Sequence, residues 1–85
     1  MTRQYLLDKY EKYGEDWQIK FIKREFKKID NCESKQKSFN NINWWVEYCE
    51  NQTGNLSLSA IKIEQYEIKM SMYNDLLYLD EFKGI

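Results

Sequence analysis

Residues 56–82, LSLSAIKIEQYEIKMSMYNDLLYLDEF, decide the fold class because their pattern fits either of two secondary structures. Apolar residues alternate with serine at Leu56 and Leu58, as they would in a β-hairpin over about 56–73. The turn of such a hairpin would fall near Glu64, where the sequence offers no Gly, Asn or Asp to form it. The missing turn residues make the hairpin the weaker alternative.

At helical spacing the same segment is apolar around more than half of its circumference. Its two apolar lines are Ile63, Tyr66, Met70, Tyr73 and Leu77, and beside them Ile61, Ile68, Met72, Leu76 and Leu79. A helix of this kind usually lies at the centre of a bundle or buries one side in a second subunit. We therefore predict a long, broadly apolar C-terminal helix with Ser57 or Ser59 as its N-cap.

Glycines and capping residues predict further helices in the first half of the chain. The chain has no proline, and each of its three glycines follows a run with helical spacing, as expected of residues that end helices. One helix is predicted from the N-cap Thr2 to Tyr13, and the next from Glu15 or Asp16 to about Ile29. Their predicted buried lines are Tyr5, Leu6, Tyr10 and Tyr13 in the first helix, and Ile19, Ile22, Phe26 and Ile29 in the second.

The polar stretch DNCESKQKSFNN predicts a loop at about 30–40. A third helix is expected to begin near Ser38 or Asn40 and to end before Gly54. Its predicted buried line is Ile42, Trp45, Val46 and Cys49. The predicted fold is therefore all-α, a small bundle of three to four helices that forms a single domain over residues 1–85 without a separate linker.

Composition limits the functions open to a chain of 85 residues. Its 13 cations nearly balance its 14 anions, which argues against bulk attraction to DNA or membranes. No segment resembles a signal peptide or approaches the roughly 20 apolar residues of a membrane span, so we expect a cytoplasmic protein with reduced thiols. Lysine far outnumbers arginine in a chain rich in Ile, Asn and Tyr, a bias that resembles AT-rich genomes such as those of low-GC Gram-positive bacteria and their phages.

The sequence has few of the residues that catalysis needs. The chain has no histidine, the commonest general base, and no glycine-rich phosphate loop. Its carboxylate pairs lie at polar positions or helix ends, where solvated charge is the ordinary state. Cys32 and Cys49 are too far apart in sequence to form a C-x-x-C pair. We expect no enzymatic activity, no metal site and no cofactor.

The stretch WQIKFIKREFKKI, residues 17–29, combines a basic face with two aromatic side chains. Its cations are Lys20, Lys23, Arg24, Lys27 and Lys28, which lie opposite the predicted buried line. Trp17 and Phe21, one turn apart, fall beside Lys20 and Arg24. One interpretation is a solvated helix face. The other is a surface for nucleic acid, where cations neutralise phosphates and aromatic rings stack on bases.

A helix-turn-helix would use Gly14 as its turn and place residues 15–29 in the DNA groove. This resemblance covers about a quarter of the chain, and it fails in its packing. The sixth and ninth positions after the turn glycine should be buried against the preceding helix, but they are Lys20 and Lys23. An ordinary helix-turn-helix protein is therefore not expected, whereas a shape-reading or single-strand mode remains open.

Trp44 and Tyr48 form a second apolar face on the third predicted helix, well away from its buried line. Three kinds of cover are possible: another helix of the chain, a second copy in a homodimer, or a binding partner. Trp and Tyr lead the residue types that carry binding energy at protein interfaces. The pair is therefore a candidate docking site.

These observations favour a small non-catalytic binding protein that occupies a surface of a larger protein or ribonucleoprotein. A phage or mobile-element inhibitor or regulator fits the size and the composition, for example an anti-defence, anti-CRISPR-like inhibitor. We expect it to act in the host cytoplasm and not to bind a membrane. The alternative is a transcriptional or replication regulator that binds nucleic acid through residues 17–29. An enzyme of unknown type is a distant third hypothesis.

Overall fold

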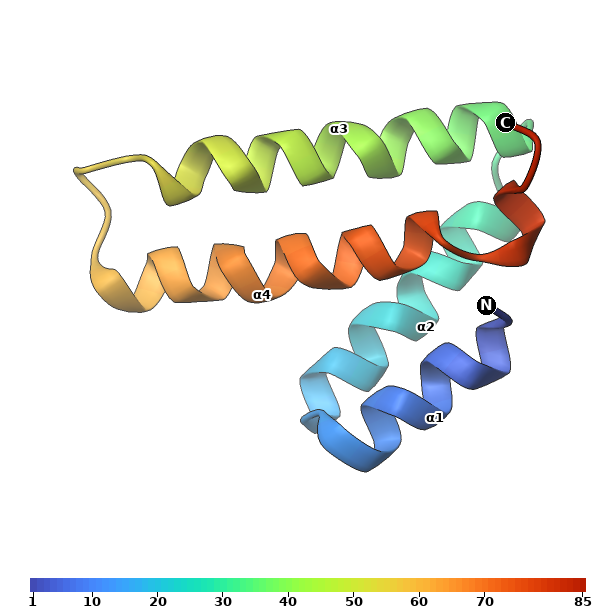
Figure 1. Ribbon diagram of the computed structural model, residues 1–85, viewed down its shortest axis with the longest axis horizontal. Helices are drawn as coiled ribbons and strands as arrows, with labels where there is room; N and C mark the ends of the chain where they lie inside the picture. The colour runs from blue at the N-terminus through green and yellow to red at the C-terminus, as the bar shows by residue number, and fades with distance from the viewer.

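The computed structural model describes residues 1–85 and contains four α-helices and one short 3₁₀ helix (Figure 1). The helices are α1 (Arg3–Tyr13), α2 (Asp16–Asp30), α3 (Lys35–Thr53), α4 (Ala60–Leu77) and the 3₁₀ helix η1 (Asp80–Phe82). The all-α prediction is confirmed. The hairpin alternative over 56–73 is wrong, because residues 60–77 form one uninterrupted helix.

Side-chain caps mark where the four α-helices begin. The predicted caps Thr2 and Ser59 accept hydrogen bonds from backbone N–H groups three residues on, at 3.1 and 3.3 Å. At the start of α2, Glu15 and Gln18 form a reciprocal capping box. Gly14 suits the turn before it, because an added Cβ would lie 2.8 Å from the carbonyl oxygen of Tyr10.

Helix α3 begins earlier than predicted. Ser34 Oγ accepts a hydrogen bond from the backbone N–H of Lys37 at 3.1 Å, so the helix starts at Lys35 and not near Ser38 or Asn40. The predicted loop at 30–40 shrinks to residues 31–34. Apart from the buried Ser38, the polar residues that follow belong to the exposed side of the first turns of α3.

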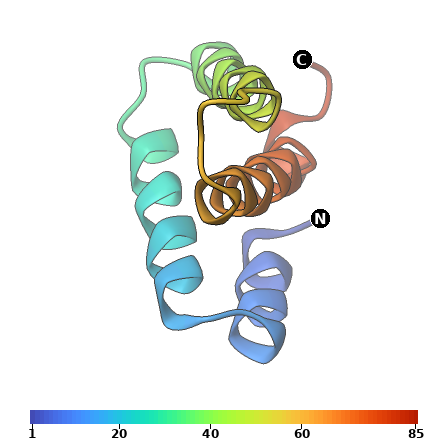
Figure 2. The same cartoon turned by 90° about the vertical axis from the view of Figure 1, so that its left-hand side faces the viewer.

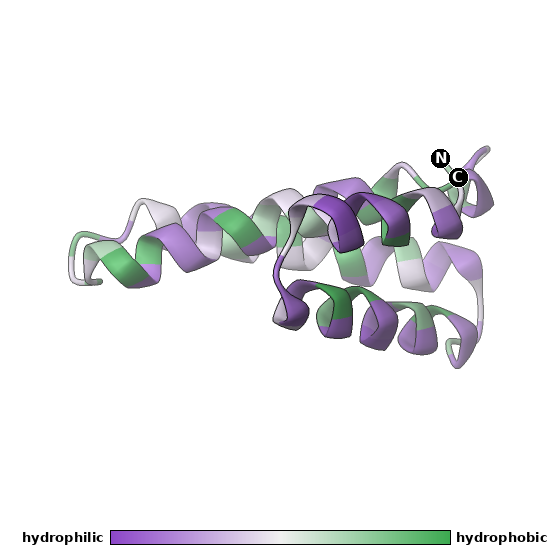
Figure 3. Ribbon diagram, turned by 90° about the horizontal axis from the view of Figure 1, so that it is seen from below, coloured by the Kyte–Doolittle hydropathy of each residue, from purple (hydrophilic) through white to green (hydrophobic).

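Helices α3 and α4 form a long antiparallel hairpin, and α1 and α2 form a shorter pair that covers only part of it (Figures 1 and 2). In the end-on view α3, α2 and α1 surround α4 on three sides. Seen from below, the loop end of the hairpin projects beyond the shorter pair (Figure 3). None of the helices has an apolar stretch long enough to span a membrane.

The core lies where α1 and α2 meet the hairpin. Its buried apolar residues are Leu6, Tyr10, Ile22, Phe26, Ile29, Ile42, Cys49, Met72, Tyr73, Leu76, Leu79 and Phe82. Burial in α4 is confined to its last turns, and between Cys49 and Met72 no residue of the chain is buried. The broad apolar surface of α4 is therefore enclosed only at one end, because α1 and α2 are too short to reach the other.

Several aromatic residues of the predicted buried lines lie outside the core. Tyr5 and Tyr13 are exposed on α1, and Trp45 is exposed on α3. Ile19 is only half-buried. The small α1 covers the bundle with one narrow face, formed by Leu6 and Tyr10, so the flanking tyrosines stay in solvent.

An ion-pair network joins the two ends of the chain. Arg3 donates hydrogen bonds to Glu81 at 2.7 Å and to Asp30 at 2.8 Å, and its guanidinium lies 5.0 Å from the centre of the Phe26 ring. Lys35 Nζ is 2.7 Å from Oε1 of the same Glu81 carboxylate. These two cations hold the pKa of Glu81 at about 2, although partial burial opposes them.

Acid is expected to destabilise the fold through Glu81. Its folded-state pKa of about 2 lies below the ordinary 4.5, so its stabilisation is fully present above about pH 4.5 and is lost as pH falls toward 2. Urea midpoints should therefore fall progressively below about pH 5. Glu81→Gln should show a shallower fall than the wild type, and an equal fall in the two proteins would contradict the assignment.

Candidate functional site

A cluster of three aromatic side chains lies on α3. Trp44 stacks on Tyr48 with ring centres 5.5 Å apart and planes 10° apart, and it meets Trp45 edge-on at 4.9 Å. The side chains come together because Trp44 and Tyr48 are one helical turn apart. Trp44 remains 55% exposed, whereas Tyr48 is half-buried and meets Tyr66 of α4 edge-on at 6.1 Å. We call Trp44, Trp45 and Tyr48 the aromatic patch.

The aromatic patch continues inward to the core. Trp45 stacks on Tyr73 of α4, with ring centres 6.0 Å apart, and Tyr73 meets Phe21 of α2 edge-on at 5.0 Å. Trp45 was predicted to be buried, yet it is 39% exposed. Its exposure arises because α2 diverges from α3 beside it and leaves a pocket at one side of the indole.

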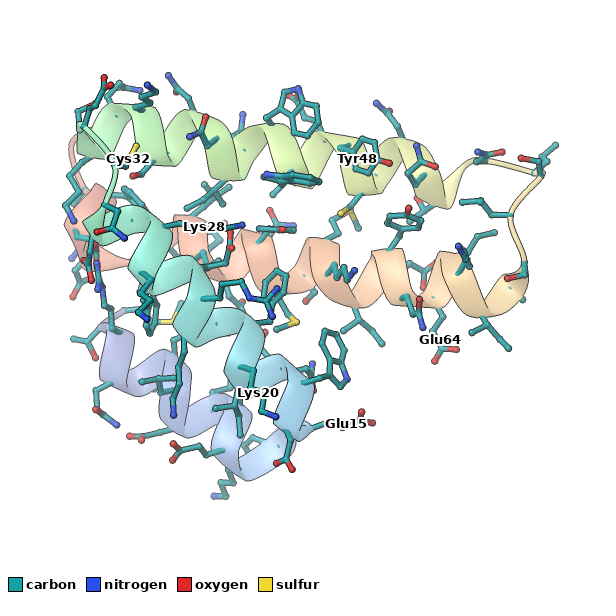
Figure 4. All side chains as sticks on the ribbon, turned by 180° about the vertical axis from the view of Figure 1, so that it is seen from behind. Glu15, Lys20, Lys28, Cys32, Tyr48 and Glu64 are labelled. Carbon is teal, nitrogen blue, oxygen red and sulfur yellow. The ribbon has the colours of Figure 1, made fainter.

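Trp17 and Phe21, predicted as one aromatic site, lie in different surroundings. Phe21 is half-buried and packs on Tyr73. Trp17 is 37% exposed, and its Nε1–H donates to Glu15 at 2.9 Å. Trp17 lines a separate hollow of about 480 Å³ between the start of α2 and the projecting part of α4. Figure 4 shows Glu15 and Glu64 on the two sides of this hollow.

A pocket of about 170 Å³ lies between α2 and α3, beside the aromatic patch. Trp44 and Trp45 form one side, and Ile29 and Ile42 contribute apolar surface. Its polar lining comprises Glu25, Lys28, Cys32, Ser38 and Asn41. Figure 4 shows Cys32 at the end of α2 close to the start of α3, and Lys28 on the side of α2 near α3.

Two buried polar side chains set the chemistry of this pocket. Glu25 is only 4% exposed, and its carboxylate is 3.0 Å from Lys28 Nζ. Ser38 is also buried, and its hydroxyl has no hydrogen-bond partner. The proximity of Ser38 to Cys32 lowers the pKa of that thiol, with help from backbone N–H groups of residues 33 and 34. The Ser38 hydroxyl is thus a buried polar group at the pocket lining that the fold leaves without a hydrogen bond.

Glu25 and Ser38 were not predicted as site residues, although their spacing in the sequence carried a signal. Glu25 lies three residues after Ile22 and four before Ile29, so it shares the inner side of α2. Ser38 lies one turn before Ile42 on the inner side of α3. A carboxylate on the inner face of α2 and a hydroxyl on the inner face of α3 indicate that polar groups lie at the interface between the two helices. The sequence alone does not show that the helices diverge there.

The basic face of α2 is exposed along its whole length. Its members are Lys20, Lys23, Arg24, Lys27 and Lys28, all of which are exposed. Lys28 pairs with Glu25, whereas the other four cations make no ion pair. Some cations elsewhere, such as Arg3, Lys9 and Lys35, have carboxylate partners, whereas Lys12, Lys62 and Lys69 have none. The positive charge of α2 is therefore not neutralised within the chain.

The basic face and the aromatic patch meet at the pocket. Lys28 lines the pocket together with Trp44 and Trp45. Arg24 is close enough to Tyr73 to counteract part of the pKa rise that burial causes in that phenol. The two surfaces that the sequence presented separately therefore adjoin on one side of the molecule, with the pocket between them.

Comparisons with protein-family models, curated proteins and solved structures find no match to this chain. No three Cys, Asp or Glu side chains gather as ligands of a metal ion would. The arrangement that remains is a surface of exposed rings, unpaired cations and one small polar pocket.

Proposed function

We propose that this chain is a small non-catalytic binding protein that occupies a surface of a larger protein or ribonucleoprotein. The observation that carries the proposal is the 55% exposure of Trp44 while its ring is already stacked on Tyr48. Rings held in place before binding lose little side-chain entropy on association. Such aromatic anchors supply much of the binding energy at protein interfaces.

The size, the AT-rich composition and the absence of histidine support an inhibitor or regulator of phage or mobile-element origin. Its proposed place of action is the host cytoplasm, and an anti-CRISPR-like inhibitor of a defence nuclease is one example. Such a protein would act by covering a working surface of its target. A protein that works by covering a surface needs exposed anchor residues, and it does not need a catalytic group.

Affinity capture from a low-GC Gram-positive host lysate tests this proposal. Immobilised wild-type protein should retain a partner that Trp44→Ala releases. Tyr13→Ala is the matched control, because Tyr13 is a 77% exposed aromatic residue on α1, outside the aromatic patch. Equal recovery of the partner by Trp44→Ala and wild type would refute the role of the patch. A second copy as the occupant would appear as a dimer in sedimentation that Trp44→Ala converts to monomer.

A second candidate function is regulation through nucleic-acid binding by residues 17–29. Four cations of α2 without a carboxylate partner favour it. Salt separates the two candidates. Raising it from about 50 to 200 mM should weaken nucleic-acid binding strongly, whereas an aromatic-anchored protein interface should change little.

A further inference from the structure

We propose that the pocket between α2 and α3 binds one unpaired base of single-stranded nucleic acid, and that the adjoining phosphates lie on the unpaired cations of α2. This inference rests on the second candidate function, nucleic-acid binding by residues 17–29, and specifies the ligand as a single strand with an unpaired base. Lys28 of the basic face lines the pocket beside Trp44 and Trp45, and the unpaired cations follow on the exposed side of the same helix. Cations beside aromatic rings are the combination that single-strand binding requires.

The size of the pocket fits one flat group. Its volume of about 170 Å³ is below the roughly 300 Å³ at which pockets for complete small ligands begin. The indoles of Trp44 and Trp45 line one side, and every base has a π-face that can stack on such rings. A base attached to a longer strand therefore fits better than a free cofactor.

The polar groups of the pocket fit a neutral group with hydrogen-bond donors and acceptors. Ser38 Oγ is buried without a partner, and the buried Glu25 carboxylate is paired only with Lys28. A base edge carries both amino donors and ring or carbonyl acceptors. A partner's Lys or Arg side chain fits less well, because Lys28 already neutralises Glu25.

The cations of α2 are placed to hold the phosphates on either side of that base. Lys20 to Lys28 spans about 12 Å along the helix, which is long enough to contact neighbouring phosphates of one strand. Lys20, Lys23, Arg24 and Lys27 have no internal partner to displace. Their charge is therefore fully available to a strand.

Fluorescence anisotropy with labelled 12-nucleotide DNA and RNA strands tests the inference. Single strands should bind at least 10-fold more tightly than the matching duplexes, because only an unpaired base can enter the pocket. With four phosphate contacts, raising salt from about 50 to 200 mM should weaken binding roughly 50-fold. Equal affinity for single strands and duplexes would overturn the proposal.

Variants separate the phosphate contacts from the base contact. Reversal of Lys20, Arg24 and Lys27 to Glu should abolish detectable binding, whereas reversal of Lys12, Lys62 and Lys69, which changes the net charge equally, should keep most of it. Ser38→Ala removes a hydroxyl without a partner, so the fold should remain while affinity drops about 3- to 10-fold. Unchanged affinity in Ser38→Ala would contradict the base site.

A strand with abasic positions distinguishes this inference from simpler phosphate binding. Abasic strands should bind at least 10-fold more weakly than intact ones. Equal affinity would refute the base pocket and leave only phosphate binding. If no strand binds while capture still depends on Trp44, the partner presents an acidic protein surface. That outcome would overturn this inference and leave the proposed function standing.

Discussion

Phe26→Ala is expected to lower the free energy of unfolding by roughly 3 to 5 kcal/mol, as large-to-small changes in cores do. Its ring is buried, and the Arg3 guanidinium lies over it at 5.0 Å. Truncation would leave a cavity in the core and remove the surface on which Arg3 rests. A small domain has about 5 kcal/mol or little more to lose. The variant should be largely unfolded, as urea titration followed by circular dichroism at 222 nm would show.

Lys23→Ala is the matched control for Phe26→Ala. Lys23 is an exposed residue of the same helix, less than one turn away, and it makes no ion pair. The free energy of unfolding of the Lys23→Ala variant should stay within about 0.5 kcal/mol of the wild-type value. A loss below about 1 kcal/mol in Phe26→Ala would mean that the core does not depend on this contact.

Trp44→Ala is expected to weaken partner binding by at least about 2 kcal/mol, close to 30-fold, while the fold stays intact. The indole contacts mainly Trp45 and Tyr48 and is 55% exposed. Aromatic pairs of this kind contribute about 0.5 to 1.5 kcal/mol, so only that much stability should be lost. Titration calorimetry with the captured partner and urea unfolding measure the two effects.

Tyr13→Ala again provides the comparison, because it removes an exposed ring from a part of the surface outside the patch. It should change neither stability nor partner affinity by more than about 0.5 kcal/mol. If Trp44→Ala instead lost about 3 kcal/mol of stability and kept its affinity, Trp44 would belong to the core and the docking proposal would fail.

Local signals were sufficient to predict the helices. Thr2 and Ser59 cap helices as their sequence positions predicted, and the absence of turn residues near Glu64 correctly disfavoured a hairpin. The start of α3 was misplaced because polar composition outweighed the cap at Ser34. Polar residues predict a loop only if no helix presents them to solvent.

The candidate site depends on relations that a helical pattern does not contain. The spacing of Trp45 placed it on the buried line of α3, but its exposure depends on the divergence of α2. Whether a cation is paired also depends on carboxylates that are distant in the sequence. Arg3, for example, pairs with Glu81, which is 78 positions away. The basic face could be predicted from α2 alone, whereas its contact with the aromatic patch and the pocket could not.

The projecting end of the α3–α4 hairpin also determines how evenly stability is distributed. Between Cys49 and Met72 no residue is buried, so this end contributes little to the cooperative unit formed around the core. Its backbone amides should therefore exchange with solvent through local opening, without global unfolding. Tyr48 and Tyr66, which meet edge-on at 6.1 Å, lie at this boundary. A partner that covers the aromatic patch would suppress this local opening. The entropy lost in ordering the hairpin end would then reduce the affinity of that partner.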